Sequence, residues 1–452
     1  MAPPFKKVLI ANRGEIALRI IRACRELGIE TVAVYSRADE NALHVRFADE
    51  AVCIGPAPAT QSYLYVPNIL SAAHVTGAEA IHPGYGFLAE KSHFASAVQA
   101  MGKVFIGPSV DHLKMFGDKL EAKEAARRAG LPLLGGSTGA VESVDEAVAV
   151  ADRTGYPVIL KAAGGGGGKG MRVVEDEATL RRVFEIAQSE SQAAFGSREV
   201  FIERFLRRPR HVEVQVAGDG LGGGIHIGTR DCSLQRRHQK IIEEAQAPFL
   251  SDTLRHNIQE AAADLIRNEK YQTVATCEFL VDGEEFFFLE VNPRIQVEHP
   301  VSEEVSGVDL IQEQIRLAAG HGLSYQQDDI HFSGHAIEVR VNAEDPFNFL
   351  PSPGRVTGYH APGGPGVRID SAIHEHATVQ PFYDSLTAKL IVKGRTRDEA
   401  LVRMLRAIDE FVVEGIRTTL PLQRELLQTE EFRKGTYWTR FVDDWVANRQ
   451  GA

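Results

Sequence analysis

Short apolar runs alternate with amphipathic segments over the first 110 residues. Strands are predicted where Val, Ile and Ala cluster, at 6–12, 30–36, 50–55, 78–84 and 103–109. Amphipathic helices are predicted between them, at 14–28, 67–77 and 88–102. Repeated strand–helix units predict a parallel sheet with helices on both faces. A ligand is expected beyond the carboxyl ends of these strands, where the segment HPGYGF at 82–87 lies.

The pattern changes after this unit. The predicted elements are, in order, a charged helix at 117–130, a glycine-tipped hairpin at 155–174, a helix at 176–190, strands at 199–205 and 210–218, a helix near 253–268 and a hairpin at 275–292. From about residue 330 the pattern indicates antiparallel strands, at 334–342, 354–370 and 386–394, followed by a helix at 397–415.

Composition restricts the class of protein. The chain has 452 residues, of which 44% are hydrophobic and 25% charged, and its net charge is −11. General nucleic-acid binding is therefore not expected. The four cysteines form no CxxC pair, which favours a reducing compartment. The N-terminus does not resemble a signal peptide and no apolar run is long enough to span a membrane, so we expect a cytoplasmic protein.

Residues 161–171 read KAAGGGGGKGM. Bare backbone beside a lysine suits a phosphate group, although an ordinary loop is an equally good interpretation. The segment is not a P-loop, because Ala163 stands at the first glycine position and Gly170 follows Lys169. Predicted strands flank the glycines, which places them at the tip of a hairpin. Ser137 lies in a G-x-S-x-G pattern, but no helix follows it directly, so a surface loop is predicted there.

The hairpin at 275–292 carries Glu278, Glu290 and Asn292. The two glutamates are twelve residues apart, so they face each other only if the turn has an odd count, such as Gly283-Glu284-Glu285 with a bulge. Asn292 then lies on the same face. Two carboxylates and an amide oxygen suit Mg²⁺, whereas a solvated hairpin face is the alternative.

Two further segments carry polar residues in a pattern of possible chemical use. In RIQVEHP at 294–300, a predicted strand would place Arg294, Gln296 and Glu298 on one side. Arginine offers a planar fork for an anion and the glutamate a general base, although a surface ion pair has the same pattern. The basic cluster RRHQK at 236–240 favours a local anion pocket in an acidic chain. Together these features predict a ligase that activates a carboxylate or bicarbonate by phosphoryl transfer.

Five segments stand in the order found in biotin carboxylases of the ATP-grasp superfamily: IANRGEIALRI, AIHPGYGFLAE, GGGGGKGMRVV, RDCSLQRRHQK and EVNPRIQVEHPVSE. The chain resembles this family from about residue 5 to about residue 445. The resemblance implies an α/β (α+β) fold. Its expected parts are a Rossmann-like domain at 1–115, an ATP-grasp domain at 116–330 with a lid subdomain at about 135–205, and a mixed C-terminal biotin carboxylase domain at 331–452.

The same resemblance assigns roles to individual residues. ATP is expected at Lys119, Lys161, Gly167, Gly168, Glu203, Arg204, Phe205, Leu206, His211, Gln235, His238, Glu278 and Glu290. Two Mg²⁺ or Mn²⁺ ions per site are expected at Glu278, Glu290 and Asn292. Bicarbonate and biotin are expected at Lys240, Arg294, Gln296, Val297, Arg340 and Tyr85. The implied catalytic residues are Arg294, Glu298, Lys240 and Arg340, with Glu298 as the base that deprotonates bicarbonate.

The resemblance also implies partners. No Met-Lys-Met biotin attachment site occurs, so biotin is expected on a separate carrier protein, with carboxyltransferase subunits beside it. Acetyl-CoA carboxylase is the expected complex, and pyruvate and propionyl-CoA carboxylases stay open. Pro365 replaces a residue that is aromatic in some dimeric relatives, whereas Arg22 and Arg368 near that interface are kept, so a homodimer is expected. Another ATP-grasp ligase and a non-catalytic nucleotide sensor are the rival interpretations.

Overall fold

The N-terminal segment forms the predicted parallel sheet, in the order β3-β2-β1-β4-β5. The computed structural model describes residues 4–162, 170–237 and 239–450. The strands are β1 (Lys7–Ile10), β2 (Glu30–Ser36), β3 (Glu50–Gly55), β4 (Ala80–His82) and β5 (Val104–Phe105). The helices here are α1 (Gly14–Glu26), α2 (Leu43–Phe47), α3 (Val66–Val75), α4 (Ser92–Ala100) and α5 (Val110–Gly117). Strand order reverses between β1 and β4, where a ligand site is expected.

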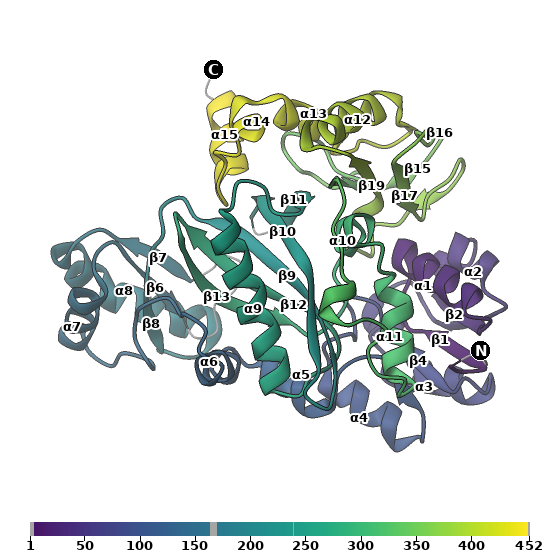
Figure 1. Cartoon of the computed structure of the whole chain (residues 1–452), viewed down its shortest axis with the longest axis horizontal. Helices are drawn as coiled ribbons and strands as arrows, with labels where there is room; N and C mark the ends of the chain where they lie inside the picture. Colours follow the sequence, from purple (N-terminus) through teal and green to yellow (C-terminus); the bar gives the residue numbers. More distant parts are fainter. Residues whose placement is uncertain (1–3, 163–169, 238, 451–452) are drawn as a thin grey trace.

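An eight-stranded antiparallel sheet forms the centre of the molecule (Figure 1). Its order is β13-β12-β9-β10-β11-β14-β19-β17. The strands are β9 (Arg210–Asp219), β10 (Gly224–Arg236), β11 (Gln239–Ala245), β12 (Gln272–Asp282), β13 (Glu285–Asn292), β14 (His335–Asn342), β17 (Val367–Ser371) and β19 (Leu386–Gly394). The sheet is continuous across residue 330, where a domain boundary is predicted, because β11 pairs with β14. Helices α9 (Asp252–Asn268), α10 (His299–Ser306), α11 (Leu310–Ala318) and α12 (Arg397–Glu410) pack against it.

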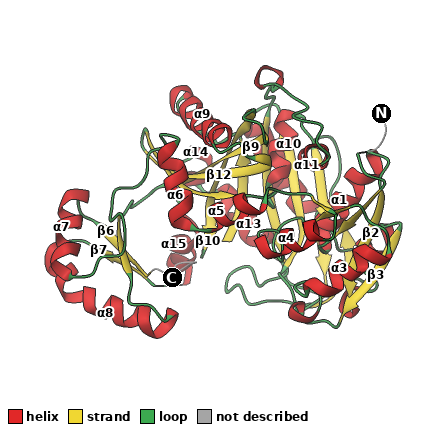
Figure 2. Ribbon diagram, turned by 90° about the horizontal axis from the view of Figure 1, so that it is seen from below, coloured by secondary structure: helices red, strands yellow, loops and turns green. Residues whose placement is uncertain are grey.

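A smaller unit projects from one end of the molecule in both views (Figures 1 and 2). Its three-stranded sheet has the order β7-β6-β8, with β6 at Val158–Ala162, β7 at Met171–Val174 and β8 at Val200–Arg204. Helices α7 (Val144–Thr154) and α8 (Glu177–Phe195) cover it, and α6 (Lys119–Arg128) precedes it. Strands β6 and β7 pair as antiparallel arms, as predicted for the glycine hairpin. The tip at 163–169 lies outside the described residues.

The C-terminal region departs from the sequence prediction. The helix predicted at 397–415 ends at Glu410, because Val412–Glu414 form β20, which pairs with β16 (Gly358–His360). The β-branched pair Val412-Val413 suits a strand better than a helix. Strands β15 (Gly354–Arg355) and β18 (Thr378–Val379) form a second small sheet. The unpredicted helices that follow are α13 (Leu420–Gln428), α14 (Glu430–Lys434) and α15 (Phe441–Gln450).

One apolar cluster joins the two large sheets. It combines Ile10 and Ile16 of the N-terminal unit with Val274 of β12, Ile295 and Ile311. The loop that carries Ile295 is thereby anchored against both sheets. No helix in the described part of the chain is long and apolar enough to cross a lipid bilayer.

Candidate active site

The β12–β13 hairpin brings the predicted metal ligands together. Glu278 lies directly opposite Glu290, and Asn292 lies opposite Thr276, two positions further along. The expected odd count does not come from a three-residue turn, because Asp282 pairs with Glu285. It comes from a bulge next to Glu278, where the register shifts by one residue. The bulge lets β13 place Phe288 in the core and Glu290 on the site face.

Lys240 is the centre of the charged network. Its Nζ donates to Glu278 Oε1 at 3.0 Å and to Glu298 Oε1 at 2.8 Å, and it contacts Glu213 as well. Lys240 lies on β11, Glu213 on β9 and Glu278 on β12, so its ammonium links three strands of the central sheet. Burial opposes the charge of Lys240, but the three carboxylates outweigh it and raise the pKa of the ammonium well above its ordinary value.

Arg340 extends the network from β14. Its Nη2 donates to Glu298 Oε2 at 2.9 Å and its Nε to Glu243 Oε1 at 2.6 Å. Glu298 is thus held between Lys240 and Arg340. Burial favours the neutral form of Glu298, but the two cations outweigh it and lower its pKa to about 2. The carboxylate that the resemblance identifies as the base is therefore ionised in this structure.

Residues 294–298 are not the predicted strand. They form a loop that ends at Glu298, the residue before α10. Apolar anchoring of Ile295 and the helix start at His299-Pro300 replace strand pairing here. Gln296 and Glu298 nevertheless point into the same cluster, as predicted. Gln296 Nε2 donates to Glu278 Oε1 at 2.9 Å, and its Oε1 accepts from Arg230 at 2.6 Å.

Arg294 lies at the edge of the cluster. Its Nε donates to Glu90 Oε1 at 2.5 Å and its Nη2 to Asn292 Oδ1 at 3.0 Å. Asn292 in turn donates to Glu278 Oε1 at 2.8 Å. The side chain of Arg294 is 22% exposed, so it can reach an incoming anion while it stays attached to the hairpin.

His211 approaches the hairpin from β9. Its Nε2 lies 2.9 Å from Glu278 Oε2, and Gln235 Nε2 lies 3.4 Å from its Nδ1. Burial disfavours the charged imidazole, but Glu278 outweighs this and raises the pKa of His211 to about 10. Glu278 is therefore surrounded by positive charge, and its own pKa lies well below the ordinary value.

Glu203 on β8 contacts one predicted nucleotide residue, Lys161, and one lysine that was not predicted, Lys123. Lys161 lies on β6 and Lys123 on α6, and these lysines outweigh burial to lower the pKa of Glu203 to about 2. Arg204 lies 5.6 Å over the ring of Phe287. Leu206 is buried, Phe205 is half-buried, and Lys119 is exposed at the start of α6. Gly167, Gly168 and His238 lie outside the described residues.

Tyr85 belongs to the segment after β4. Its hydroxyl contacts Glu15 of α1, and Asn12 Nδ2 donates to Tyr85 O at 2.7 Å. The other oxygen of Glu15 lies 3.3 Å from Nζ of Lys389, a fully buried lysine on β19. Lys389 also donates to Val297 O at 2.9 Å. Lys389 therefore links the predicted biotin side to the predicted bicarbonate loop.

Sequence reasoning missed several residues of this cluster. They are Lys123, Glu213, Arg230, Glu243 and Lys389. Arg230 is fully buried and donates to Glu213, Gln215, Thr276, Gln296 and Ser302. For the residues on strands, the signal that could have marked them is a charged residue at an inward position, as Arg230 in TRDCSL and Lys389 in LTAKLIVKG.

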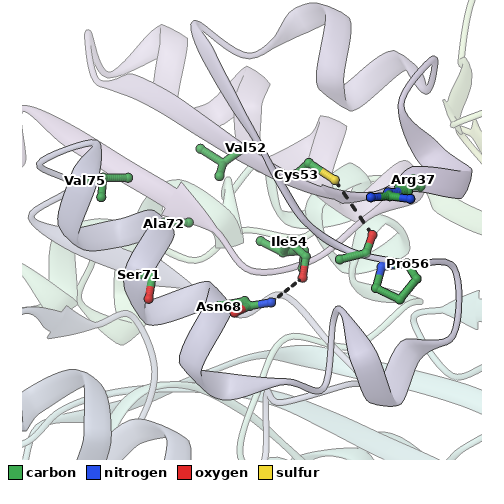
Figure 3. A pocket seen from close by; sticks show the side chains of 10 residues that line it. Arg37, Val52, Cys53, Ile54, Pro56, Asn68, Ser71, Ala72 and Val75 are labelled. Atoms are coloured by element: carbon green, nitrogen blue, oxygen red, sulfur yellow. Dashed lines mark hydrogen bonds between the residues drawn. The ribbon is translucent and has the colours of Figure 1, made fainter.

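A separate pocket of about 400 Å³ lies between β3 and α3 (Figure 3). The exposed thiol Cys53 and Asn68 line it, and Asn68 Nδ2 donates to Ile54 O at 2.9 Å. The ten lining residues include none of the predicted site residues. The pocket is therefore distinct from the charged cluster.

Three models of known protein families match consecutive parts of the chain. The model of the biotin carboxylase N-terminal domain matches residues 4–113, that of the carbamoyl-phosphate synthase L chain ATP-binding domain 118–326, and that of the biotin carboxylase C-terminal domain 338–444. The biotin carboxylase of Pseudomonas aeruginosa is 54% identical over 432 residues, which is 95% of this chain and 96% of that protein. The chain belongs to the biotin carboxylase family. Its fold is accordingly an N-terminal parallel α/β unit followed by an ATP-grasp region.

Two further relatives bear on the function. A pyruvate carboxylase subunit from Methanothermobacter thermautotrophicus is 50% identical over 98% of this chain and 90% of its own length. The biotin carboxylase domain dimer of the Hydrogenobacter thermophilus 2-oxoglutarate carboxylase, solved with MgADP, ADP and bicarbonate, has a TM-score of 0.89 and 45% identity. The structural match covers 97% of each chain.

The oxygen donors on the hairpin fit the divalent cation that biotin carboxylases use with ATP. Within the described residues Glu290 has no hydrogen-bonding partner, and burial together with the charge of Glu278 raises its pKa. Two opposed carboxylates without a shared cation repel each other, and a magnesium ion relieves this repulsion. The residues present therefore suit the metal.

Proposed function

We propose that this biotin carboxylase uses ATP and bicarbonate to carboxylate biotin held on a separate carrier protein. The observation that carries this proposal is the position of Glu298 between Lys240 and Arg340, at 2.8 and 2.9 Å. One ionised carboxylate thus has a cation on the bicarbonate side and another on the biotin side. This arrangement supports an enzyme that joins these two substrates, because the base lies between their expected sites.

Lys240, Arg294, Gln296 and the backbone at Val297 would hold bicarbonate. The negative charge of bicarbonate would offset the positive charge around Glu298. The pKa of Glu298 would then rise toward the range in which a carboxylate is an effective base. Glu298 then takes the bicarbonate proton, and the freed oxygen attacks the γ-phosphorus of ATP while the bond to ADP breaks. Carboxyphosphate is formed and divides into CO₂ and phosphate.

Phosphate then takes the ureido N–H proton of biotin, and the nitrogen forms a bond to CO₂. Arg340 would stabilise the negative charge that develops on the ureido oxygen. Tyr85, held by Glu15, would fix the ring of biotin on the other side. The chemistry is therefore that of a ligase that forms a C–N bond.

Lys161, Lys123 and Lys119 would hold the ATP phosphates, and Glu203 would position the first two lysines. Glu278, Glu290 and Asn292 would hold Mg²⁺, which offsets phosphate charge during the transfer. Glu278, which accepts from Lys240 Nζ at 3.0 Å in this structure, would then be a ligand of the ion.

We further propose that the carrier and the carboxyltransferase are separate subunits, that the chain forms a homodimer, and that its location is cytoplasmic, in keeping with four free cysteines. The role that we favour is the first half-reaction of acetyl-CoA carboxylase, in which biotin is carboxylated. A pyruvate carboxylase role is the second candidate, supported by the 50% identity to a pyruvate carboxylase subunit. Reconstitution with each carboxyltransferase, and carboxylation of acetyl-CoA or pyruvate as the result, separates the two roles.

The test is ADP release with Mg²⁺ and bicarbonate, with and without free biotin or biotinylated carrier. We expect stimulation by biotin that requires bicarbonate. Glu298→Gln should lower the rate about 100-fold or more, because a positioned general base contributes at least this much. Glu284→Gln, an exposed carboxyl on the same hairpin region, is the matched control and should keep the wild-type rate. Full activity of Glu298→Gln, with unchanged melting temperature, would rule out Glu298 as the base.

A further inference from the structure

Two buried glutamates face each other behind Arg340. Glu243 on β11 and Glu338 on β14 are direct partners in the antiparallel register, and neither has exposed surface. Opposed residues in such a pair share one face of the sheet, with Cβ atoms about 5 Å apart. The opposite face of β14 carries Val339, which packs in the apolar cluster beneath α12. The two carboxyl groups are therefore enclosed between the sheet and α10.

Hydrogen bonding accounts for only one of their four oxygens. Glu243 Oε1 accepts from Arg340 Nε at 2.6 Å. In the described part of the chain, Glu243 Oε2 and both oxygens of Glu338 have no hydrogen-bonding partner. Two buried carboxylates side by side cannot both stay ionised, and an unpaired buried charge is costly. One proton shared between the two groups removes the repulsion and supplies the missing donor.

In the described part of the chain, no cation hydrogen-bonds to Glu338. The charged and titratable groups of the described residues that interact with the pair are Arg340 on β14, Lys389 on β19, Lys240 on β11, Cys232 on β10, Glu298 before α10 and Tyr85 after β4. Lys389 directs its Nζ to Val297 O and Glu15, and Arg340 is shared by Glu243 and Glu298. Burial and the neighbouring carboxylates raise the pKa of Glu338 well above its ordinary value and that of Glu243 to about 7.

We propose that Glu338 is the protonated member of a carboxyl–carboxylate pair with Glu243, and that it acts as a positioning residue for Arg340. The Glu338 O–H donates to the free oxygen of Glu243, which holds the guanidinium through its other oxygen. With Glu338 neutral, Arg340 faces two carboxylates rather than three. The negative potential at Arg340 is then weaker, so the guanidinium attracts the ureido oxygen of biotin more strongly.

The kinetic consequence rests on the proposed role of Arg340 in biotin carboxylation. The pair with one proton on Glu338 is the active form, so kcat/KM for biotin is retained as long as Glu338 keeps that proton. It falls as pH rises through the raised pKa of Glu338, because ionised Glu338 adds a third negative charge near Arg340. Glu338→Gln keeps a donor of the same shape and cannot ionise, so this variant should lack the alkaline decline.

The proton itself is tested without substrates. Infrared difference spectra of the full chain at pH 8, wild type minus Glu338→Gln, should show the C=O stretch of a protonated carboxyl, which lies apart from the carboxylate bands. The matched control is Glu375→Gln, whose carboxyl is 62% exposed and should contribute only carboxylate bands. Absence of a protonated carboxyl band in the Glu338→Gln difference spectrum would overturn the inference. This result is independent of any carboxylation assay.

Kinetics then test the positioning role. Glu338→Gln should keep kcat/KM for biotin within about twofold of wild type at pH 7, whereas Glu338→Leu, which removes the donor, should lower it about tenfold. A Glu338→Gln profile with the same alkaline decline as wild type would contradict the role. If wild type shows the infrared band but carboxylates no biotin, the proposed function fails and the shared proton stands.

Discussion

At the scale of single residues, Lys389 shows how a buried charge connects distant parts of the site. It has no exposed surface and lies between Val297 O, Glu15 and, at 3.9 Å, Asp370. Removing one partner of such a group leaves the other partners buried and unpaired. We expect Lys389→Met to lower the free energy of unfolding by about 3 kcal/mol, measured by equilibrium urea denaturation.

A double-variant cycle separates this cost from a general packing defect. Glu15→Gln removes one of the charges that Lys389 leaves behind, so Lys389→Met/Glu15→Gln should be less destabilised than the sum of the two single variants. Strict additivity, or a Lys389→Met protein as stable as wild type, would contradict the coupling. The cycle needs no activity measurement and therefore stands apart from the proposed function.

Residues with a local signature could be predicted, whereas those defined by distant contacts could not. Gln296 and Glu298 are identified from the segment RIQVEHP, because a strand would place them on one side. The segment is a loop, but this loop also directs both side chains into the cluster. Arg230 and Lys389 carry no such signature. Their partners include Gln296, 66 positions from Arg230, and Val297, 92 positions from Lys389, and only the folded sheet reveals these contacts.

At the scale of elements, strand pairing is more predictable than its irregularities. An odd count correctly predicts that Glu278 faces Glu290, but the prediction assigns the extra residue to the turn. The structure places it in a bulge within β13. A bulge depends on what each side of the strand must contact, here the core at Phe288 and the site at Glu290, and a single sequence does not show those contacts. The overlong helix prediction at 397–415 fails for a related reason, since pairing with β16 overrides helical periodicity.

The end of α14 provides a prediction at this scale. Gly435 follows the helix with φ +67°, and an added Cβ would clash with the ring of Phe249. Gly435→Ala therefore combines a left-handed backbone penalty with a steric clash. Gly28, which follows α1 at φ +74° with open space around it, is the matched control. We expect Gly28→Ala to cost about 1 kcal/mol of unfolding free energy and Gly435→Ala clearly more, as measured by thermal or urea unfolding. Equal losses of unfolding free energy in the two variants would show that the ring of Phe249 can move aside without destabilising the protein.

At the scale of the whole molecule, the site depends on a sheet that no single predicted domain contains. Lys240 and Glu298 come from the region before residue 330, and Arg340 comes from the region after it. The three predicted parts are each recognisable in the sequence because strand and helix periods change between them. Their shared sheet could not be predicted, because the pairing of β11 with β14 joins residues about 95 positions apart. A local pattern of hydrophobic and polar residues predicts the strands, but it does not show which distant strands pair.

This continuity predicts the outcome of dividing the chain at the predicted boundary. A fragment of residues 1–330 would expose the β11 edge and lose the β14 and β19 side chains that cover Leu234 and Ile242 in one apolar cluster. An unpaired, apolar edge strand promotes aggregation. We expect this fragment to be aggregated or rapidly proteolysed when made alone, and to regain a protease-resistant core when residues 331–452 are co-expressed with it. A monomeric fragment with a cooperative thermal transition close to that of the full chain would show that the region before residue 330 folds independently. In that case β14 docks onto a sheet that is already complete.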